Sequence, residues 1–289
     1  MTPTESNSSL GLCFFDNQLF YAVDHPESEG RLARIGSVDF NFDLPVTILR
    51  GDKQNFSGIR NTVSRLKDEF GIEHIRLLSF PTQECWTTFP KIVYDKPDER
   101  EDHINILMQG IDRSNIEPTW YDLSNQKFKF LLLRNREKLG GMQQLASSAS
   151  TADLVSDFEI GSLWSRHSGV KGSFMTVGCF HDCIAVSSFV LGKLRGATYL
   201  SFDEPEDLPY LWLQNARELS WMNGLHEQIY VYGIKAYRII DILNPFWDSE
   251  TADIIKMDSL EKMNVKAAEH TYGFNLECAF PAIMLALGE

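Results

Sequence analysis

The first 80 residues alternate apolar and polar positions in a way that predicts three strands, a helix and a fourth strand. The first two apolar segments are separated by Asp16, Asn17 and Gln18, which is typical of a hairpin turn. Gly71 follows the helical segment as a stop. The predicted strands are residues 10–15, 19–23, 31–42 and 74–80, and the predicted helix is 56–70.

The same order returns after Gly169, so the chain predicts a repeated α/β unit. The second unit comprises strands at 173–180, 183–190, 193–202 and 228–232, with helices at 205–223, 236–243 and, closing the chain, 276–287. Between the units the pattern predicts helices at 98–108, 138–149 and 153–167 and strands at 118–122 and 127–134. A duplicated unit places a cleft between its two lobes, where ligands usually bind.

Composition and charge narrow the function classes. With 289 residues, 43% of them hydrophobic, the chain is long enough for two lobes with separate cores. A net charge of −13 opposes binding to nucleic acid or to an anionic membrane surface. No apolar run approaches the roughly 20 residues of a membrane-spanning helix, and the polar start shows no secretory signal. We therefore expect a cytoplasmic protein whose five cysteines are reduced.

Three segments resemble, in order and spacing, the actin-like ATPase superfamily, and within it the PilM-type pilus-assembly proteins and their relatives in type II secretion platforms. The segments are IRLLSFPTQECWTTFPKI, KFKFLLLRNREKLGGMQQLASSASTADLVSDFEIGSLWSR and CAFPAIMLALGE. The resemblance implies an actin-like α/β fold of two ribonuclease-H-like lobes, with a small α/β insertion in the first lobe. The implied domains are a first lobe at 1–90, completed by helix 276–289, an inserted subdomain with a linking helix at 91–168, and a second lobe at 169–275.

The first phosphate loop of that superfamily carries Asp-x-Gly and then Ser or Thr, because backbone N–H groups must approach the phosphates. The corresponding stretch here is GLCFFDNQLFYAV. If Gly11 is the anchor, Cys13 and Phe15 replace the aspartate and the glycine. If Asp16 is the acid, Gln18 replaces the glycine. Either alignment predicts the loss of the phosphate cradle.

The other two nucleotide loops also depart from the superfamily pattern. In SFMTVGCF, Gly178 remains but Thr176 replaces the aspartate, and a hydroxyl cannot supply its negative charge. In IYVYGIKAY, Gly233 remains while Ile234 and Lys235 replace further glycines. We therefore expect neither ATP hydrolysis nor a cofactor. The candidate remnant of the nucleotide site is Gly11, Asp16, Thr176, Gly178, Gly233 and Lys235.

Aromatic residues concentrate around the insertion, with Trp86, Phe89, Trp120 and Tyr121 as candidates for partner binding. Packing of the inserted subdomain is the other interpretation of these residues. The resemblance implies that a short cytoplasmic tail of an inner-membrane protein lies between the first lobe and the insertion. A metal site at Cys179-x-His181-Asp182-Cys183 is not expected, because a tight turn interrupts the run.

Three hypotheses follow. The first is a non-enzymatic scaffold that docks a partner protein, such as the cytoplasmic tail of an inner-membrane pilus or secretion component. The second is an ATPase or small-molecule kinase with a rearranged site, using ATP and Mg²⁺ and resting on Gly11, Asp16, Gly178 and Gly233. The third is a protein of the same fold whose partner has no connection with pili. The sequence does not separate the first from the third.

Overall fold

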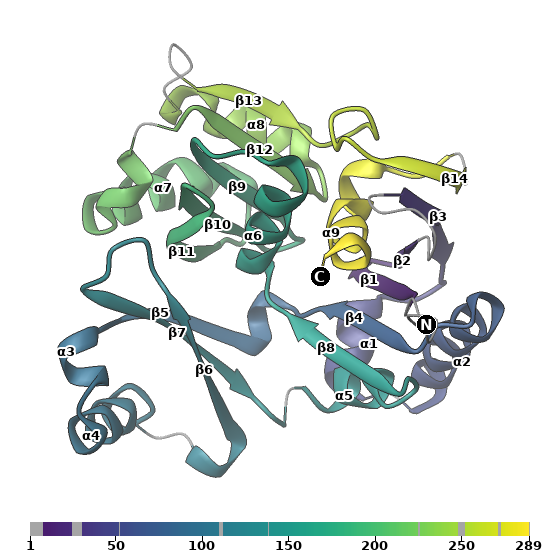
Figure 1. The fold of residues 1–289 in the computed structure, drawn as a ribbon, viewed down its shortest axis with the longest axis horizontal. Helices are drawn as coiled ribbons and strands as arrows, with labels where there is room; N and C mark the ends of the chain where they lie inside the picture. The colour runs from purple at the N-terminus through teal and green to yellow at the C-terminus, as the bar shows by residue number, and fades with distance from the viewer. Residues whose placement is uncertain are drawn as a thin grey trace, which may run out of the picture.

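The computed structural model describes residues 8–24, 31–51, 53–109, 112–137, 139–224, 226–247, 252–270 and 273–288. These residues form two large sheets and one small sheet (Figure 1). Residue 138, where the sequence predicts the start of a helix, lies outside the described residues. Within the described ranges, no helix has both the length and the apolar composition that crossing a bilayer requires.

The first large sheet joins three antiparallel strands to three parallel ones, in the order β14-β3-β2-β1-β4-β8. Its strands are β1 (Ser9–Phe15), β2 (Gln18–Asp24), β3 (Arg31–Asp39), β4 (His74–Leu78), β8 (Thr151–Val155) and β14 (Lys266–His270). The central strand β1 is buried along its whole length, because helices cover both faces of the sheet. One face packs on α1 (Leu44–Arg50), α2 (Lys53–Phe70) and α5 (Gly140–Ala146), and the other on α9 (Leu276–Leu287).

The second large sheet repeats this arrangement in the order β11-β10-β9-β12-β13. Its strands are β9 (Ser173–Cys179), β10 (Cys183–Val190), β11 (Lys193–Ser201), β12 (Gln228–Gly233) and β13 (Asp253–Lys256). Residues from α7 (Leu208–Glu218) and α8 (Ala236–Leu243) share a core with one face of the sheet. The helices α6 (Asp157–Ser168) and α9 lie between the two large sheets (Figure 1). The two sheets therefore confirm the predicted duplication.

The inserted subdomain is a three-stranded antiparallel sheet in the order β5-β7-β6, with two short helices beside it. Its elements are β5 (Glu84–Pro90), α3 (Lys91–Tyr94), α4 (Pro97–Leu107), β6 (Ile116–Asp122) and β7 (Phe128–Asn135). Phe89, Ile104 and Leu131 form its own small core. The insertion also contacts the second lobe, because Ser124 N donates to Leu194 O at 2.7 Å.

One predicted helix is wrong over its first residues. The sequence predicts a helix from residue 153, but Thr151–Val155 forms the parallel strand β8, which pairs with β4. The helix α6 begins only at Asp157, after Ser156, whose backbone N donates to Glu159 Oε1 at 3.0 Å in a capping box.

Sheet membership also differs from the expected domain ranges 1–90, 91–168 and 169–275. Strand β5 belongs to the insertion, whereas β8 and β14 belong to the sheet of the first lobe. The helix at residues 276–287 is confirmed as α9, which packs on β1 and β2 of the first lobe. The strands β8 and β14 are parallel strands that depend on pairing with distant neighbours. The local pattern of apolar and polar residues therefore does not predict them.

Candidate functional site

The turns of the two central hairpins meet between the lobes. Asp16 lies in the β1–β2 turn with a left-handed φ of 48°, and its Oδ1 lies 3.4 Å from His181 Nδ1 in the β9–β10 turn. Beside this pair, the rings of Phe15 and Phe180 lie 5.5 Å apart between centroids. A polar contact and an aromatic contact therefore occupy the place where the two predicted phosphate loops face each other.

Gly11 lies within strand β1 rather than in a loop, which corrects its expected placement. A Cβ at this position would stand 2.0 Å from Ala282 O and 2.7 Å from Ala286 N, both in α9. The absence of a side chain lets α9 approach the first sheet closely. Helix packing thus accounts for this glycine.

Thr176 and Gly178 also lie within a strand, β9, and are both buried. A Cβ on Gly178 would stand 2.7 Å from both carboxylate oxygens of Asp157. This glycine therefore makes room for a buried acid on α6. The expected placement of Gly178 in a phosphate loop is corrected in the same way as that of Gly11.

Gly233 and Lys235 do lie at a turn, between β12 and α8, with left-handed φ angles of 96° and 52°. The backbone of this turn packs onto β9: Ile234 N donates to Cys179 O at 2.9 Å, and a Cβ on Gly233 would stand 2.3 Å from the same oxygen. Lys235 is exposed. The predicted adenosine loop is thus a turn, and Gly233 lets the backbone of this turn approach the backbone of β9.

Asp157 is a buried acid between the lobes that is not among the candidate residues predicted from the sequence. It is the first residue of α6 and is 1% exposed. Tyr232 Oη donates to its Oδ1 at 3.0 Å, whereas its Oδ2 has no hydrogen-bond partner among the described residues. Burial raises the pKa of the Asp157 carboxyl to about 7; the Tyr232 hydrogen bond opposes the shift and the charge of Glu84 adds to it. The capping-box sequence SDFE marks this helix start, but periodicity gives no sign of the burial.

The cysteines around this acid are buried thiols. Cys13 Sγ donates to Cys278 O at 3.3 Å, and burial raises the pKa of Cys13 and Cys179. Cys183 is also buried, whereas His181 is exposed in the turn between Cys179 and Cys183. Within the described part of the chain, no group of three His, Cys, Asp or Glu side chains is arranged to hold a metal ion.

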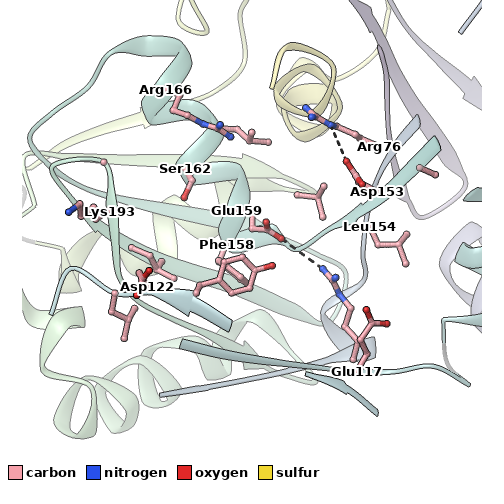
Figure 2. A pocket seen from close by; sticks show the side chains of 18 of the residues that line it. Arg76, Glu117, Asp122, Asp153, Leu154, Phe158, Glu159, Ser162, Arg166 and Lys193 are labelled. Carbon is pink, nitrogen blue, oxygen red and sulfur yellow. Dashed lines mark ion pairs between the residues drawn. The ribbon is translucent and has the colours of Figure 1, made fainter. Parts of the chain in front are cut away.

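A large concave feature lies elsewhere, between the first lobe and the insertion. A cavity of about 1130 Å³ is bordered by β8, α6, the insertion strands β6 and β7, and the β10–β11 turn. We call it the insertion groove. Figure 2 shows Asp153 and Leu154 at one end of the groove and Lys193 and Asp122 at the other, with Ser162 and Glu159 on the α6 wall between them. Its volume exceeds the roughly 300–1,000 Å³ that is typical of small-molecule sites.

A buried ionic network holds the insertion against the first lobe at the base of this groove. Glu84 accepts hydrogen bonds from four donors: Arg134 Nε at 2.9 Å, Trp86 Nε1 at 2.8 Å, and the hydroxyls of Ser79 and Ser156. Arg134 lines the groove, and its Nη2 stands 3.9 Å from Glu159 Oε1 without a hydrogen bond to any described residue. A charged pair inside the protein is stable only with such additional donors, so the network rigidifies this junction.

Of the four aromatic residues predicted to bind a partner, three pack inside the protein and one lines the insertion groove. Trp86 packs edge-on against Phe158, and the fully buried Phe89 packs against Trp120 in the core of the insertion. Tyr121 lines the insertion groove and packs edge-on against Phe158. Burial raises the pKa of the Tyr121 hydroxyl, helped by the nearby Glu159 charge. Contact between Tyr121 and a partner stays a prediction.

Comparison with known proteins shows the fold. No protein-family model matches this sequence, and no curated protein matches it. Among solved structures, the PilM–PilN type IV pilus biogenesis complex aligns with a TM-score of 0.65 at 11% identity, over 97% of this chain and 96% of that chain. A Bacteroides thetaiotaomicron protein with an actin-like ATPase fold and unknown function aligns with a TM-score of 0.51 at 14% identity, over 88% and 93%.

A third similar structure is the cytoplasmic domain of EpsL, an inner membrane component of the type II secretion system of Vibrio cholerae. It aligns with a TM-score of 0.52 at 7% identity, over 96% of this chain and 95% of that chain. The chain thus has an actin-like fold, as the sequence segments imply. At these identities the likeness concerns the fold alone.

Proposed function

We propose that this actin-like chain is a non-enzymatic scaffold that docks a partner protein in the insertion groove. The carrying observation is the groove itself, about 1130 Å³ in volume and bordered by an edge strand, a helix and the insertion. A groove of this size between two rigid units suits an extended peptide segment better than a small molecule.

The contacts between the two central hairpin turns support a non-enzymatic role. Phosphate binding by hairpin turns needs backbone N–H groups that face an open space. Here Phe15 and Phe180 contact each other at that place, and Asp16 faces His181. Ile234 N, at the adenosine turn, is already bonded to Cys179 O. We infer that no ATP and no Mg²⁺ is used.

The partner that we propose is the cytoplasmic tail of an inner-membrane component of a pilus or secretion assembly. Two similar structures support it: PilM is in complex with PilN, and EpsL is an inner membrane component of a secretion system. On this proposal the protein is cytoplasmic and reaches the inner membrane through its partner, with no nucleic acid involved.

Two measurements test the proposal. A photo-crosslinking amino acid at Ser162, which lines the groove, should capture a membrane protein in cells, whereas the same probe at the exposed Lys171 should not. Filling the groove with Ser162→Trp should abolish capture by a second probe at Gln143, another lining residue. Equal capture from both probe positions, or capture that survives the filled groove, would count against docking there.

Calorimetry with millimolar ATP and Mg²⁺ should show no binding, and micromolar affinity would refute the non-enzymatic role.

The alternative is an ATPase or small-molecule kinase with a rearranged site, and one observation favours it. Asp157 is a buried acid between the lobes with a pKa of about 7, and one of its oxygens has no hydrogen-bond partner in the described part of the chain. Strongly shifted acids are frequent at catalytic sites. If this reading holds, Asp157→Asn abolishes phosphate release from ATP. If the scaffold proposal holds, no ATP turnover exists for the substitution to remove.

A further inference from the structure

The outermost strand of the first sheet presents its hydrogen-bonding edge to the insertion groove. Four consecutive residues of β8, from Ala152 to Val155, line the groove. Side chains alternate between the two faces of a sheet, so a groove that fronted one face would contact only every second residue. Contact with four residues in succession therefore indicates an exposed strand edge, and among the described residues β4 is the one strand that pairs with β8.

The pairing of β8 with β4 determines which backbone groups face the groove. Thr151 N donates to Glu73 O at 3.1 Å, and Ser79 N donates to Val155 O at 2.9 Å. In a parallel ladder, alternate residues direct their N–H and C=O groups to opposite neighbours. The backbone groups of Ala152 and Leu154 thus point away from β4, toward the groove. A strand laid beside β8 would satisfy all four of these groups.

The acidic side chains that line the groove are already ion-paired. Asp153 Oδ2 lies 3.7 Å from Arg76 Nε and 3.2 Å from His74 Nε2. Glu117 Oε2 lies 3.9 Å from Arg136 Nε. These pairs use basic groups both inside and outside the groove lining. Because these carboxylates are neutralised, the side chains at the other end determine the net charge of the groove.

That other end carries an excess of positive charge. Lys129 donates a hydrogen bond to Asp122 there and lowers the pKa of its carboxyl. Lys91 and Lys193, which line the groove, lower the same pKa further. Lys91 and Lys193 are exposed and form no ion pair within 4.0 Å with any described residue. Lys91, Lys129 and Lys193 lie around Asp122, and Asp95 also lies near Lys129, so three lysines against two carboxylates give this corner an excess positive charge within a chain of net charge −13. Its complement is an acidic group.

We propose that the insertion groove takes an extended peptide strand that pairs with Ala152 and Leu154 of β8 and places an Asp or Glu side chain beside Lys91 and Lys193. This inference rests on the proposed docking function and adds the binding mode and the chemistry of the partner. The backbone pairing provides affinity for any extended segment, and the lysine corner selects segments with an acidic residue at one position.

A displayed library of random 12-residue peptides, selected on the intact protein, tests both parts. Enriched peptides should carry Asp or Glu at one fixed position, and Ser162→Trp should prevent their binding. The double variant Lys91→Gln/Lys193→Gln should bind a selected peptide roughly 3- to 10-fold more weakly, because exposed ion pairs are each worth up to about 1 kcal/mol. The matched control Lys171→Gln/Lys266→Gln changes two exposed lysines elsewhere and should bind normally.

Hydrogen exchange tests the strand pairing separately. The amides of Ala152 and Leu154 should gain protection when a selected peptide binds. Groove-dependent peptides without an acidic preference, or without protection at β8, would overturn this inference while leaving the docking function intact. A library that yields no peptide sensitive to Ser162→Trp would overturn both.

Discussion

Replacement of the buried acid between the lobes, Asp157→Asn, should change the stability of the protein in a strongly pH-dependent way. The carboxyl is 1% exposed, and burial raises its pKa from the ordinary value of 3.8 to about 7. Between these values the folded protein holds a proton that the unfolded chain has lost. The contribution of Asp157 to stability is therefore fully present below pH 3.8 and is lost as the pH rises toward about 7.

The magnitude follows from the two pKa values. Relative to strongly acidic solution, the raised pKa of Asp157 lowers the stability of the folded state by about 2 kcal/mol near pH 5 and about 4 kcal/mol near pH 8, because the carboxyl ionises more readily in the unfolded chain. An asparagine cannot ionise, so the variant should gain roughly 2 to 3 kcal/mol relative to the wild type between these two conditions. Any pH-independent penalty of the amide, such as an unmet N–H group, cancels in this difference.

Urea denaturation of both proteins at the two pH values measures this difference directly. The matched control is Asp68→Asn, which makes the same chemical change at a side chain that is 73% exposed and should show little pH dependence. If the stability difference between Asp157→Asn and the wild type is the same at both pH values, the carboxyl titrates normally. That result would refute the assignment of Asp157 as a buried acid that is protonated in the folded state.

Two further predictions concern a buried histidine and a packing glycine. Burial, helped by the charge of Arg195, lowers the pKa of His226 to about 4. The stability that depends on neutral His226 should therefore be present above pH 6.5 and lost as the pH falls toward 4. The loss should reach up to about 3 kcal/mol. Thermal melts across this range should show the loss, and His226→Gln should reduce it; an unchanged slope in the variant would assign the acid sensitivity to other groups. Gly11→Ala places a Cβ against Ala282 O and should lower the free energy of unfolding by about 3 kcal/mol. The control Gly58→Ala, in open space on α2, should be neutral or slightly stabilising in the same urea titration, and equal effects at both glycines would remove the packing explanation.

The local pattern of the chain determined much of the fold. The hairpins β1–β2 and β9–β10 and the helices α2, α8 and α9 follow from alternation, helical spacing and turn residues, all of which act between near neighbours in sequence. Repetition of the same order in two units, together with the quoted segments, also pointed to the actin-like fold that the solved structures share.

Only the tertiary structure decided the strands that depend on distant partners. The segment Thr151–Val155 resembles the start of a helix in sequence, yet it is a strand because β4, far earlier in the chain, supplies its hydrogen bonds. The strand β14 likewise depends on β3. Pairing between distant segments leaves no local signature, which is why β8 and β14 belong to the first lobe although the expected ranges 91–168 and 169–275 place them elsewhere.

The candidate site shows the same division. From the sequence, Gly11 and Gly178 were glycines left over from phosphate loops, but in the fold they make room for α9 and for Asp157. The burial of Asp157 and the insertion groove arise only where β8, α6, the insertion and the second lobe come together. Sequence by itself determined which segments are strands and helices wherever neighbouring residues decide it. Tertiary structure decided which residues are enclosed and which face a groove, because enclosure is a property of surfaces brought together from distant parts of the chain.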